Sequence, residues 1–518
     1  MSKKRKVLQG SASNLVRLLL SMLVSLVLPP FLVHRMPPAE YSAWVLILQL
    51  SAYVNLLDFG LQTAIGKFVA EYDASGDRDA SHGIVSTSFS LLAAAAIIAC
   101  AAVVVMSWLT PKLFHQMPPA LMSEVRIALL LVGFSSALAL PFNTFGSTFI
   151  GLQQYLFPTI VAMVGRVGSA ATLIILLLLH CSIVQLAFVT AGFNLATAAA
   201  HFLLWRKFAQ ERVNFSFLTF NRRSAIQLAK YGSVLSVWTM TMFLISGLDV
   251  VIVGHYQYKE TGFYAIASGA ANFMLAIISS VFGPLVPAIS SMQASATTRR
   301  IGDLCIKATR YCVLLLCLLG APLVLGAYPL LSLWVGKNYA SRSALYLEIL
   351  VLGNVVRYLC SPYLVTVIAT GKQRSATMAT VTEACVNIVL SIWLVQKIGA
   401  VGVAVGTLVA AFISVGVHLL VSIPNTQGAI TMDRPRFLLQ GLLRPLLVVT
   451  PSLCLYPFWH QGTMLPAAPV AFVLWAAATL AIAWLVVLTS EDRQEAKRSV
   501  SRLLYWRRGP AWASVDRP

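Results

Sequence analysis

Long apolar segments recur along the whole chain, and they constrain its fold more than any other feature. Fourteen of them approach the roughly 20 residues that a helix needs to cross a hydrocarbon core of about 30 Å. They cover residues 12–33, 41–65, 83–109, 125–149, 157–179, 183–204, 231–254, 263–289, 308–330, 344–370, 376–396, 400–423, 440–458 and 467–489. Lipid offers no partner to backbone polar groups, so such segments are helices. The sequence therefore predicts an all-α integral membrane protein with about 14 transmembrane helices.

Composition supports the same class. The chain is 58% hydrophobic and 11% charged, whereas a soluble domain carries about 25% charged residues. Its eight cysteines contain no C-x-x-C pair and mostly lie in apolar segments. We interpret them as small core residues and expect neither a metal site nor a cofactor. Between the apolar segments no loop exceeds roughly 26 residues, which leaves no room for a catalytic domain.

The net charge of +20 would suit a nucleic-acid partner, but its distribution points to membrane topology. With the N-terminus inside, 28 of the 38 Lys and Arg fall in cytoplasmic segments and only seven in outer loops. Cytoplasmic loops of membrane proteins collect positive charge in this way. We therefore predict that both termini are cytoplasmic and that no nucleic acid binds. Because no A-x-A-like site follows the first apolar segment and Arg17 interrupts it, we expect the helix after "MSKKRK" to stay uncleaved.

An internal repeat relates the two halves of the chain at an offset of 220 residues. Glu40 matches Glu260, and Gly151 in "FIGLQQ" matches Gly371 in "IATGKQ". Leu113-Phe114 and Gly133 match Leu333-Trp334 and Gly353 at the same spacing.

The repeat predicts two pseudo-symmetric six-helix bundles, over residues 1–210 and 211–425. Two additional helices occupy 426–490, and a basic cytoplasmic tail covers 491–518, which we place on the inner membrane surface. Six helices per bundle give both bundles one orientation. Folds of this kind bind substrate between the halves near the midplane.

Ionisable residues inside transmembrane segments are expensive and usually face a cavity or a protein interior. Asp249 lies in the seventh segment, on one side with Ser236, Thr239 and Ser246. This polar stripe indicates a cavity wall and a coupling or gating role for Asp249. A structural hydrogen bond between two helices is the alternative.

Arg357, near the centre of the tenth segment, is the strongest single indication of a site. Asn354 and Tyr358 share its face. A guanidinium is permanently charged and its planar fork suits phosphate. The three residues are therefore candidates for substrate binding, and a buried salt bridge from Arg357 to Asp249 or Glu383 is the alternative.

Three further charges complete the candidate set. Arg166 in the fifth segment and Glu383 in the eleventh lie at equivalent depth in the two repeats. Arg166 is a substrate-binding candidate and Glu383 a coupling or gating candidate, and the two would pair across the halves in one state. A purely structural role is an equal alternative. Arg17, one turn inside the first segment, is a cavity candidate or else snorkels to the interface.

The repeated bundles resemble the multidrug/oligosaccharidyl-lipid/polysaccharide exporter superfamily. Within it, the segment "SGLDVVIVGHYQYKETGFYAIA" resembles the Wzx-like polysaccharide-repeat-unit flippases, with Asp249, Gly254, Gly262 and Tyr264 in the family pattern. The segment "LLDFGLQTAIGKFVAEY" resembles the end of that family's second helix. The resemblance covers about residues 10–425.

This resemblance implies a multi-pass protein of the bacterial inner membrane that is not an enzyme. Such proteins move undecaprenyl-pyrophosphate-linked oligosaccharides from the cytosolic to the periplasmic leaflet by alternating access. The product would serve O-antigen, capsule or exopolysaccharide synthesis. Coupling to H⁺ or Na⁺, and association with a polysaccharide polymerase and a chain-length regulator, belong to the same expectation.

Three alternatives stay open. A lipid II flippase shares the fourteen helices and the cationic cavity. A cation-coupled drug antiporter of the superfamily usually has twelve helices and relies on acidic cavity groups, whereas the first segment here offers Arg17. A membrane polymerase or ligase would need a larger outer loop than those around Pro111–Glu124 and Leu331–Ser343.

Overall fold

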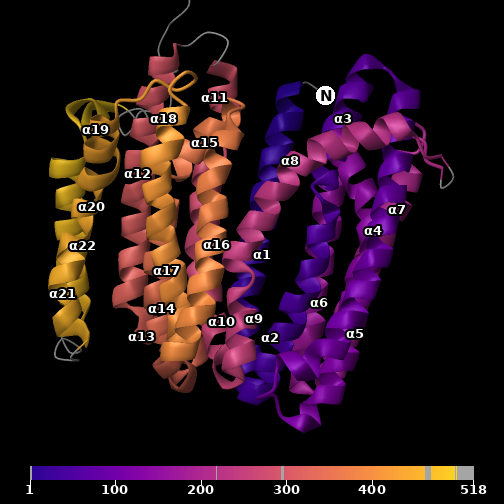
Figure 1. The fold of residues 1–518 in the computed structure, drawn as a ribbon, viewed down its shortest axis with the longest axis horizontal. Coiled ribbons are helices and arrows are strands. Elements are labelled where there is room, and N and C mark those ends of the chain that lie inside the picture. The colour runs from indigo at the N-terminus through magenta and orange to yellow at the C-terminus, as the bar shows by residue number, and fades with distance from the viewer. Residues whose placement is uncertain (1–2, 217–218, 293–296, 461–467, 496–497, 499–518) are drawn as a thin grey trace, which may run out of the picture. The chain divides into compact units, whose positions relative to one another are not determined.

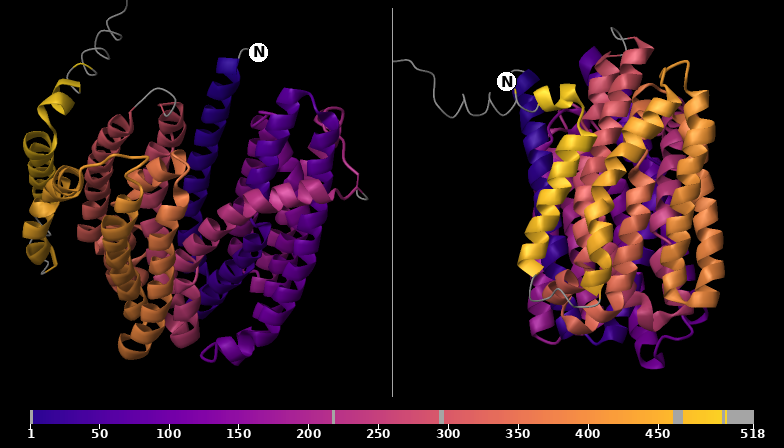
Figure 2. Two further views of the ribbon diagram at one scale, coloured as in Figure 1. Left: turned by 45° about the horizontal axis from the view of Figure 1, so that its top comes forward. Right: turned by 90° about the vertical axis from the view of Figure 1, so that its left-hand side faces the viewer.

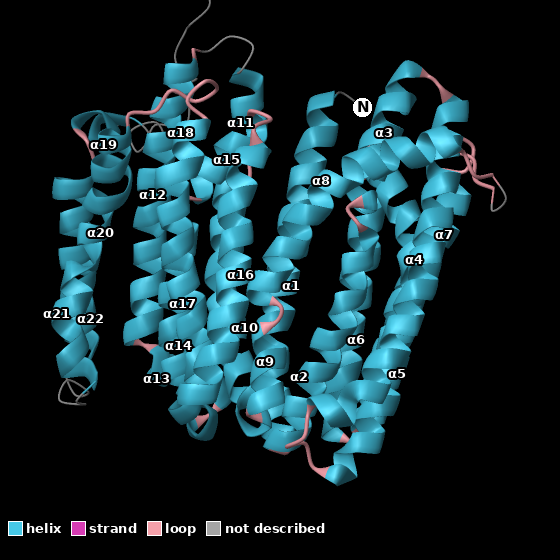
Figure 3. Ribbon diagram, in the orientation of Figure 1, coloured by secondary structure: helices cyan, strands magenta, loops and turns pink. Residues whose placement is uncertain are grey.

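The computed structural model describes residues 3–216, 219–292, 297–460, 468–495 and 498. Within these ranges every regular element is a helix (Figure 3). Fourteen helices or helix pairs in the described ranges are long and apolar enough to cross a membrane. Each of them overlaps one of the segments predicted from the sequence. The predicted class and number of transmembrane helices are thus confirmed.

The chain forms two compact units that interleave along the sequence. The first comprises the described parts of Met1–Phe273, Ala327–Gly353 and Thr380–Ile413. The second comprises the described parts of Met274–Gly326, Asn354–Ala379 and Ser414–Pro518. The repeat boundaries at residues 210, 425 and 490 stay predictions.

The first unit is built around α5, which packs against α4 and α7 (Figure 1). Aromatic rings fill its core, and the Phe145 and Trp205 ring centroids lie 4.8 Å apart. Its helices are α1 (Lys3–Arg35), α2 (Pro38–Ala52), η1 (Tyr53–Asp58), α3 (Leu61–Ser75), α4 (Arg78–Leu113), α5 (Pro119–Gly151), α6 (Leu156–Leu178), α7 (Ile183–Phe208), α8 (Arg222–Ser246), α9 (Asp249–Tyr256), η2 (Tyr258–Glu260), α13 (Ala327–Val335) and most of α10 (Thr261–Phe282), α14 (Lys337–Tyr358), α16 (Gln373–Ile398) and α17 (Ala400–Val417).

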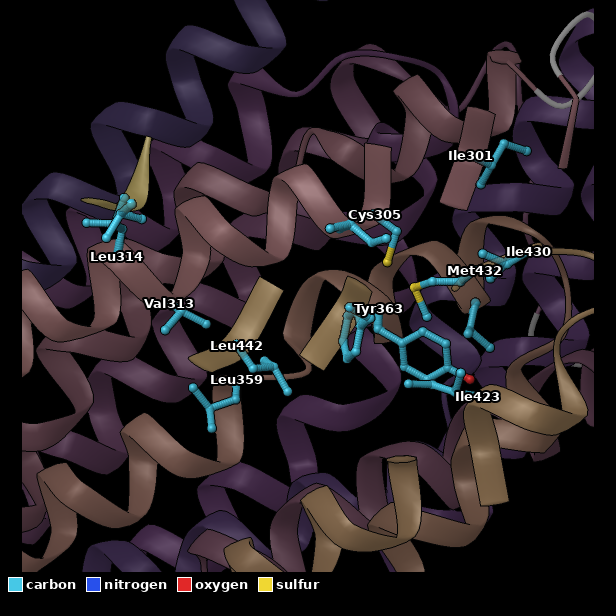
Figure 4. Close-up of a cluster of buried hydrophobic side chains, with 14 of the residues drawn as sticks. Ile301, Cys305, Val313, Leu314, Leu359, Tyr363, Ile423, Ile430, Met432 and Leu442 are labelled. Carbon is cyan, nitrogen blue, oxygen red and sulfur yellow. The ribbon is translucent and has the colours of Figure 1, made fainter. Parts of the chain in front are cut away.

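The second unit is built around α12 (Thr298–Leu325), which packs against α15 (Ser361–Ala369). It also packs against η4 (Phe437–Leu443) and α20 (Arg444–Leu446), which belong to the thirteenth membrane span. Its apolar core includes Cys305, Tyr363 and Met432 (Figure 4). Its helices are α11 (Leu285–Met292), α12 (Thr298–Leu325), α15 (Ser361–Ala369), α18 (Ile423–Asn425), α19 (Arg434–Arg436), α20 (Arg444–Leu446), α21 (Thr450–His460) and α22 (Ala468–Ile482), with the short elements η3 (His418–Ser422), η4 (Phe437–Leu443), η5 (Leu447–Val449) and η7 (Ala483–Val487). Figure 2 shows α21 and α22 side by side in yellow.

Prolines inside helices leave carbonyl groups without their usual helical partner, and side chains supply the missing donors. Pro30 has no N–H for the carbonyl of Leu26, and the Trp334 indole donates to that oxygen at 2.6 Å. The carbonyl of Tyr358, at the end of α14 and four residues before Pro362, likewise accepts a hydrogen bond from the Cys312 thiol at 3.7 Å. Side chains from other helices thus help the chain to tolerate proline at these depths.

Equivalent positions of the predicted repeat meet directly in the first unit. Gly262 lies 220 residues after Ser42, and its backbone N–H donates to the Ser42 hydroxyl at 3.1 Å. A Cβ on Gly262 would lie 2.9 Å from the Tyr41 ring, so only glycine permits this approach. Two-fold-related repeats make such self-contacts where equivalent elements lie beside the axis. The repeat itself stays a prediction.

Candidate functional site

The seventh transmembrane helix is broken immediately before Asp249. α8 ends at Ser246 and α9 begins at Asp249. Helix ends leave carbonyl groups without helical donors, and in lipid the protein must supply substitutes. The Gly247 carbonyl accepts hydrogen bonds from Gln49 at 2.9 Å and from Tyr53 at 3.0 Å. The Ile245 carbonyl accepts one from Asn387 at 2.7 Å. Side chains from α2, η1 and α16 therefore hold the break that positions Asp249.

Asp249 is 5% exposed and lies at the start of α9, where the helix dipole favours a carboxylate. It accepts hydrogen bonds from the Thr407 hydroxyl at 3.0 Å, the Tyr264 hydroxyl at 3.3 Å and the Asn387 amide at 3.5 Å. The Ser391 hydroxyl donates to the Asn387 side-chain oxygen at 2.9 Å. We call these five residues, from α9, α10, α16 and α17, the Asp249 cluster.

Hydroxyl groups of the Asp249 cluster lie within hydrogen-bond distance of more than one acceptor. The Thr407 hydroxyl lies 3.0 Å from Asp249 Oδ2, 3.2 Å from Asn387 Oδ1 and 3.1 Å from the Val403 carbonyl, yet it carries one hydrogen. The Ser391 hydroxyl has a similar choice between Asn387 Oδ1 and the same carbonyl. A buried carboxylate surrounded by hydroxyl, amide and carbonyl oxygens is suited to take up a proton or a small hard cation.

Close packing of α16 on α17 brings Ser391 and Asn387 to Thr407. A Cβ on Gly406 would lie 2.9 Å from the backbone nitrogen of Ser391 and 2.8 Å from its hydroxyl. We predict that Gly406→Val forces the helices apart, destabilises the protein by about 1–3 kcal/mol and impairs transport. Gly416→Val is the matched control, because nothing lies within 4 Å of a Cβ there. Thermal unfolding in detergent and a transport assay compare the two variants, and equal behaviour would contradict this account.

The other charged candidates of the first unit have different surroundings. Glu383 is 2% exposed and lies one turn before Asn387 on the same buried face of α16. Arg166 is exposed and donates to the Ser25 hydroxyl of α1 at 3.2 Å. Arg17 is exposed near the start of the first membrane span. Their roles stay predictions.

The candidates from the tenth transmembrane helix belong to the second unit. Arg357 is half-buried in the last turn of α14 and donates to the Asn354 side-chain oxygen at 3.2 Å. Tyr358 ends the helix, and its carbonyl accepts a hydrogen bond from the thiol of Cys312. Asn354, Arg357 and Tyr358 therefore form one group at the break between α14 and α15. Their role in substrate binding stays a prediction.

Sequence patterns missed part of the Asp249 cluster. The sequence places Asn387 and Ser391 on the face of Glu383, and the structure buries all three. Thr407 went unnoticed, because a single hydroxyl in the segment "AVGTLVAAF" gives no periodic signal. Tyr264 belonged to a recognised motif but had no assigned role. Both residues approach Asp249 only through the packing of separate helices.

The arrangement of the helices is shared with solved membrane transporters. A lipid II flippase (MurJ, inward closed conformation) matches 92% of this chain and 98% of its own, with a TM-score of 0.67 and 13% identity. A multidrug resistance MATE family transporter in an inward-facing conformation covers 79% of this chain and 98% of its own, with a TM-score of 0.62 and 12% identity. At these identities the likeness establishes the fold alone.

Sequence comparison identifies the family. The profile of the polysaccharide biosynthesis protein family matches residues 7–293, which is more than half of the chain. The chain belongs to that family, as a multi-pass protein of the bacterial inner membrane. It is also similar to the uncharacterized membrane protein EpsK of Bacillus subtilis (strain 168), with 23% identity over 453 residues, covering 84% of this chain and 86% of the relative.

Proposed function

We propose that this protein flips undecaprenyl-pyrophosphate-linked oligosaccharide repeat units from the cytosolic to the periplasmic leaflet of the inner membrane. The observation that carries the proposal is membership of a polysaccharide biosynthesis family, in a chain with the fold of a lipid II flippase. A lipid-linked sugar is the form in which a polysaccharide unit crosses a bilayer. On this proposal the protein transports its substrate and performs no covalent chemistry on it.

The Asp249 cluster supports a coupled cycle. Its carboxylate is buried beside the break of the seventh helix, and the Thr407 hydroxyl lies within hydrogen-bond distance of both Asp249 and Asn387. Uptake of H⁺ or Na⁺ there would change the hydrogen bonds that Thr407 and Asn387 make. The same Asn387 also holds the Ile245 carbonyl at the helix break. Ion binding and the shape of the seventh helix would therefore be linked, which is what ion-driven alternating access requires.

We propose that Arg357 binds the pyrophosphate of the substrate. Its guanidinium combines permanent charge with a planar fork, and Asn354 orients one of its nitrogens. We predict that Arg357→Ala reduces transport about tenfold or more, since hydrogen bonds to charged groups contribute about 1.5–3 kcal/mol. Arg357→Lys keeps the charge but loses the fork, and we expect an intermediate rate. Full activity of Arg357→Ala would exclude this role.

The test of the whole proposal is deletion of the gene, followed by analysis of the surface polysaccharide and of the lipid-linked sugars in sealed membrane vesicles. We expect surface glycan to disappear and undecaprenyl-linked repeat units to accumulate facing the cytosol. Accumulation of a peptidoglycan precursor would identify a lipid II flippase instead. Unchanged glycan with altered sensitivity to small molecules would identify a drug exporter. Either of these outcomes overturns the proposed substrate.

A further inference from the structure

The last two transmembrane helices present an arginine on a lipid-facing surface. Arg444 lies within the thirteenth membrane span, Arg434–Tyr456. Leu439, Leu443 and Leu447 lie on either side of it in the sequence and are 60%, 54% and 48% exposed. Apolar side chains this exposed on a transmembrane helix face acyl chains. A permanently charged guanidinium in this setting requires a polar partner.

Backbone carbonyls at the end of the fourteenth helix are the partners. Arg444 Nε donates to the carbonyl of Val486. Arg493 Nη2 donates to the carbonyl of Leu485 at 2.8 Å and to that of Leu488 at 3.1 Å. The last carbonyls of a helix lack helical donors and carry negative partial charge, so they attract cations. Two guanidiniums thus gather on one turn, in and just after η7.

Carboxylates do not neutralise this pair. Of the acids nearby, Asp492 pairs with Arg310, Glu495 with Lys307, and Asp303 with Arg436. Among the described residues, neither Arg444 nor Arg493 forms an ion pair with a carboxylate. Each guanidinium has five N–H donors, and the carbonyls engage only some of them. The remaining donors and both charges are available to an external anion.

We propose that Arg444 and Arg493 form a binding site for the phosphate of an anionic phospholipid, whose acyl chains lie along Leu439, Leu443 and Leu447. Guanidinium forks match phosphate oxygens, and basic pockets between transmembrane helices bind anionic headgroups. Snorkelling explains a single interfacial arginine, but it does not explain a second one fixed to the same helical turn. The charge distribution predicts this end to be cytosolic. The site is independent of the transported substrate.

Native mass spectrometry of the purified, delipidated full-length protein tests the site. We expect phosphatidylglycerol to be retained in preference to phosphatidylethanolamine. In R444Q/R493Q the apparent affinity for phosphatidylglycerol should fall about tenfold or more, as expected for the loss of charged hydrogen bonds. R444K/R493K, which keeps the charge without the fork, should bind with intermediate affinity. It also serves as the test variant if the glutamine variant does not fold.

R222Q/R223Q is the matched control, because it removes the same charge from two adjacent exposed arginines on the face predicted to be cytosolic. We expect it to retain phosphatidylglycerol as the parent protein does. An equal loss in the control would show general attraction to a basic surface and overturn the site. Complete displacement of the lipid by excess inorganic phosphate would indicate a site for free anions and overturn the lipid assignment.

Discussion

Asp249→Asn will reduce transport by at least about tenfold and remove its dependence on the driving ion. The amide keeps the size of the side chain but loses the negative charge, and it places two N–H hydrogens where the carboxylate only accepts hydrogen bonds. A tenfold loss corresponds to about 1.4 kcal/mol of coupling free energy, within the usual range for coupled sites. The measurement is the rate at which lipid-linked oligosaccharide changes leaflet in proteoliposomes under an imposed ion gradient.

Two variants separate coupling from mere structural support. Tyr264→Phe removes one of the donors to Asp249 but leaves the charge, so we expect a smaller loss than in Asp249→Asn and retained dependence on the driving ion. Asp303→Asn removes a half-exposed carboxylate from α12 and should leave transport unchanged. If Asp249→Asn is as stable as the parent protein and transports at the full rate, Asp249 is a structural residue.

The identity of the coupling ion follows from the same assay. A pH gradient and a Na⁺ gradient are imposed separately on the parent protein. A proton would neutralise the Asp249 carboxylate, whereas Na⁺ would need the oxygens of Asn387, Thr407 and Val403 in addition. Thr407→Val should therefore have a much greater effect on a Na⁺-driven cycle than on a proton-driven one.

The sequence predicts the membrane helices well because the bilayer imposes a length and an apolar composition on each span. All fourteen predicted segments correspond to helices, yet several of those helices are broken in ways the sequence shows only in part. Pro284 and Pro362 mark the breaks before α11 and near the start of α15, whereas the break at Gly247 has no proline. That break is held by Gln49, Tyr53 and Asn387, which are distant in sequence.

Contacts among charges are even less predictable, because they depend on which helices become neighbours. The sequence places Arg166 and Glu383 at equivalent depth and pairs them in one state, which stays a prediction, but it gives no signal for the hydrogen bond from Arg166 to Ser25. It also treated the residues after Ser490 as part of a basic surface tail. The structure instead buries Asp492, the second residue of that tail, against α12. An acid in a basic segment was the available signal, and its partner Arg310 lies 182 positions earlier.

Asp492 and Arg310 form a buried ion pair that fastens the end of the fourteenth helix to α12. The Arg310 Nη2 to Asp492 Oδ2 distance is 2.9 Å, and the two side chains are 6% and 1% exposed. Tyr311 donates to the same carboxylate at 3.0 Å and Thr489 donates at 2.7 Å. Burial works to raise the pKa of Asp492, but the hydrogen bonds from Thr489 and the charge of Arg310 together hold that pKa below its ordinary value. The folded protein therefore stabilises the ionised form of the Asp492 side chain.

We expect Asp492→Leu to destabilise the second unit by about 3–5 kcal/mol, because Arg310 would remain buried without its counter-charge. Thermal unfolding in detergent at neutral pH measures the change. The double variant Arg310→Met with Asp492→Leu should recover much of the lost stability, since an apolar pair replaces a buried ion pair at little cost. A double variant as unstable as the single one would mean that Asp492 acts mainly through Thr489 and Tyr311.

An exposed ion pair between α12 and α19 shows how much of the stabilisation by the Arg310–Asp492 pair comes from burial. Arg436 and Asp303 lie 2.8 Å apart, as close as the buried pair, but each side chain is 47% exposed. Asp303→Leu should therefore change stability by no more than about 1 kcal/mol.

Acid gives a second distinction. Because the folded pKa of Asp492 is lowered, its contribution is complete above its ordinary value of 3.8 and is lost as the pH falls through the folded value. The difference in stability between the parent protein and Asp492→Asn should narrow in that acidic range, whereas a difference that persists there would show that the charge of Asp492 is not what fastens the helix.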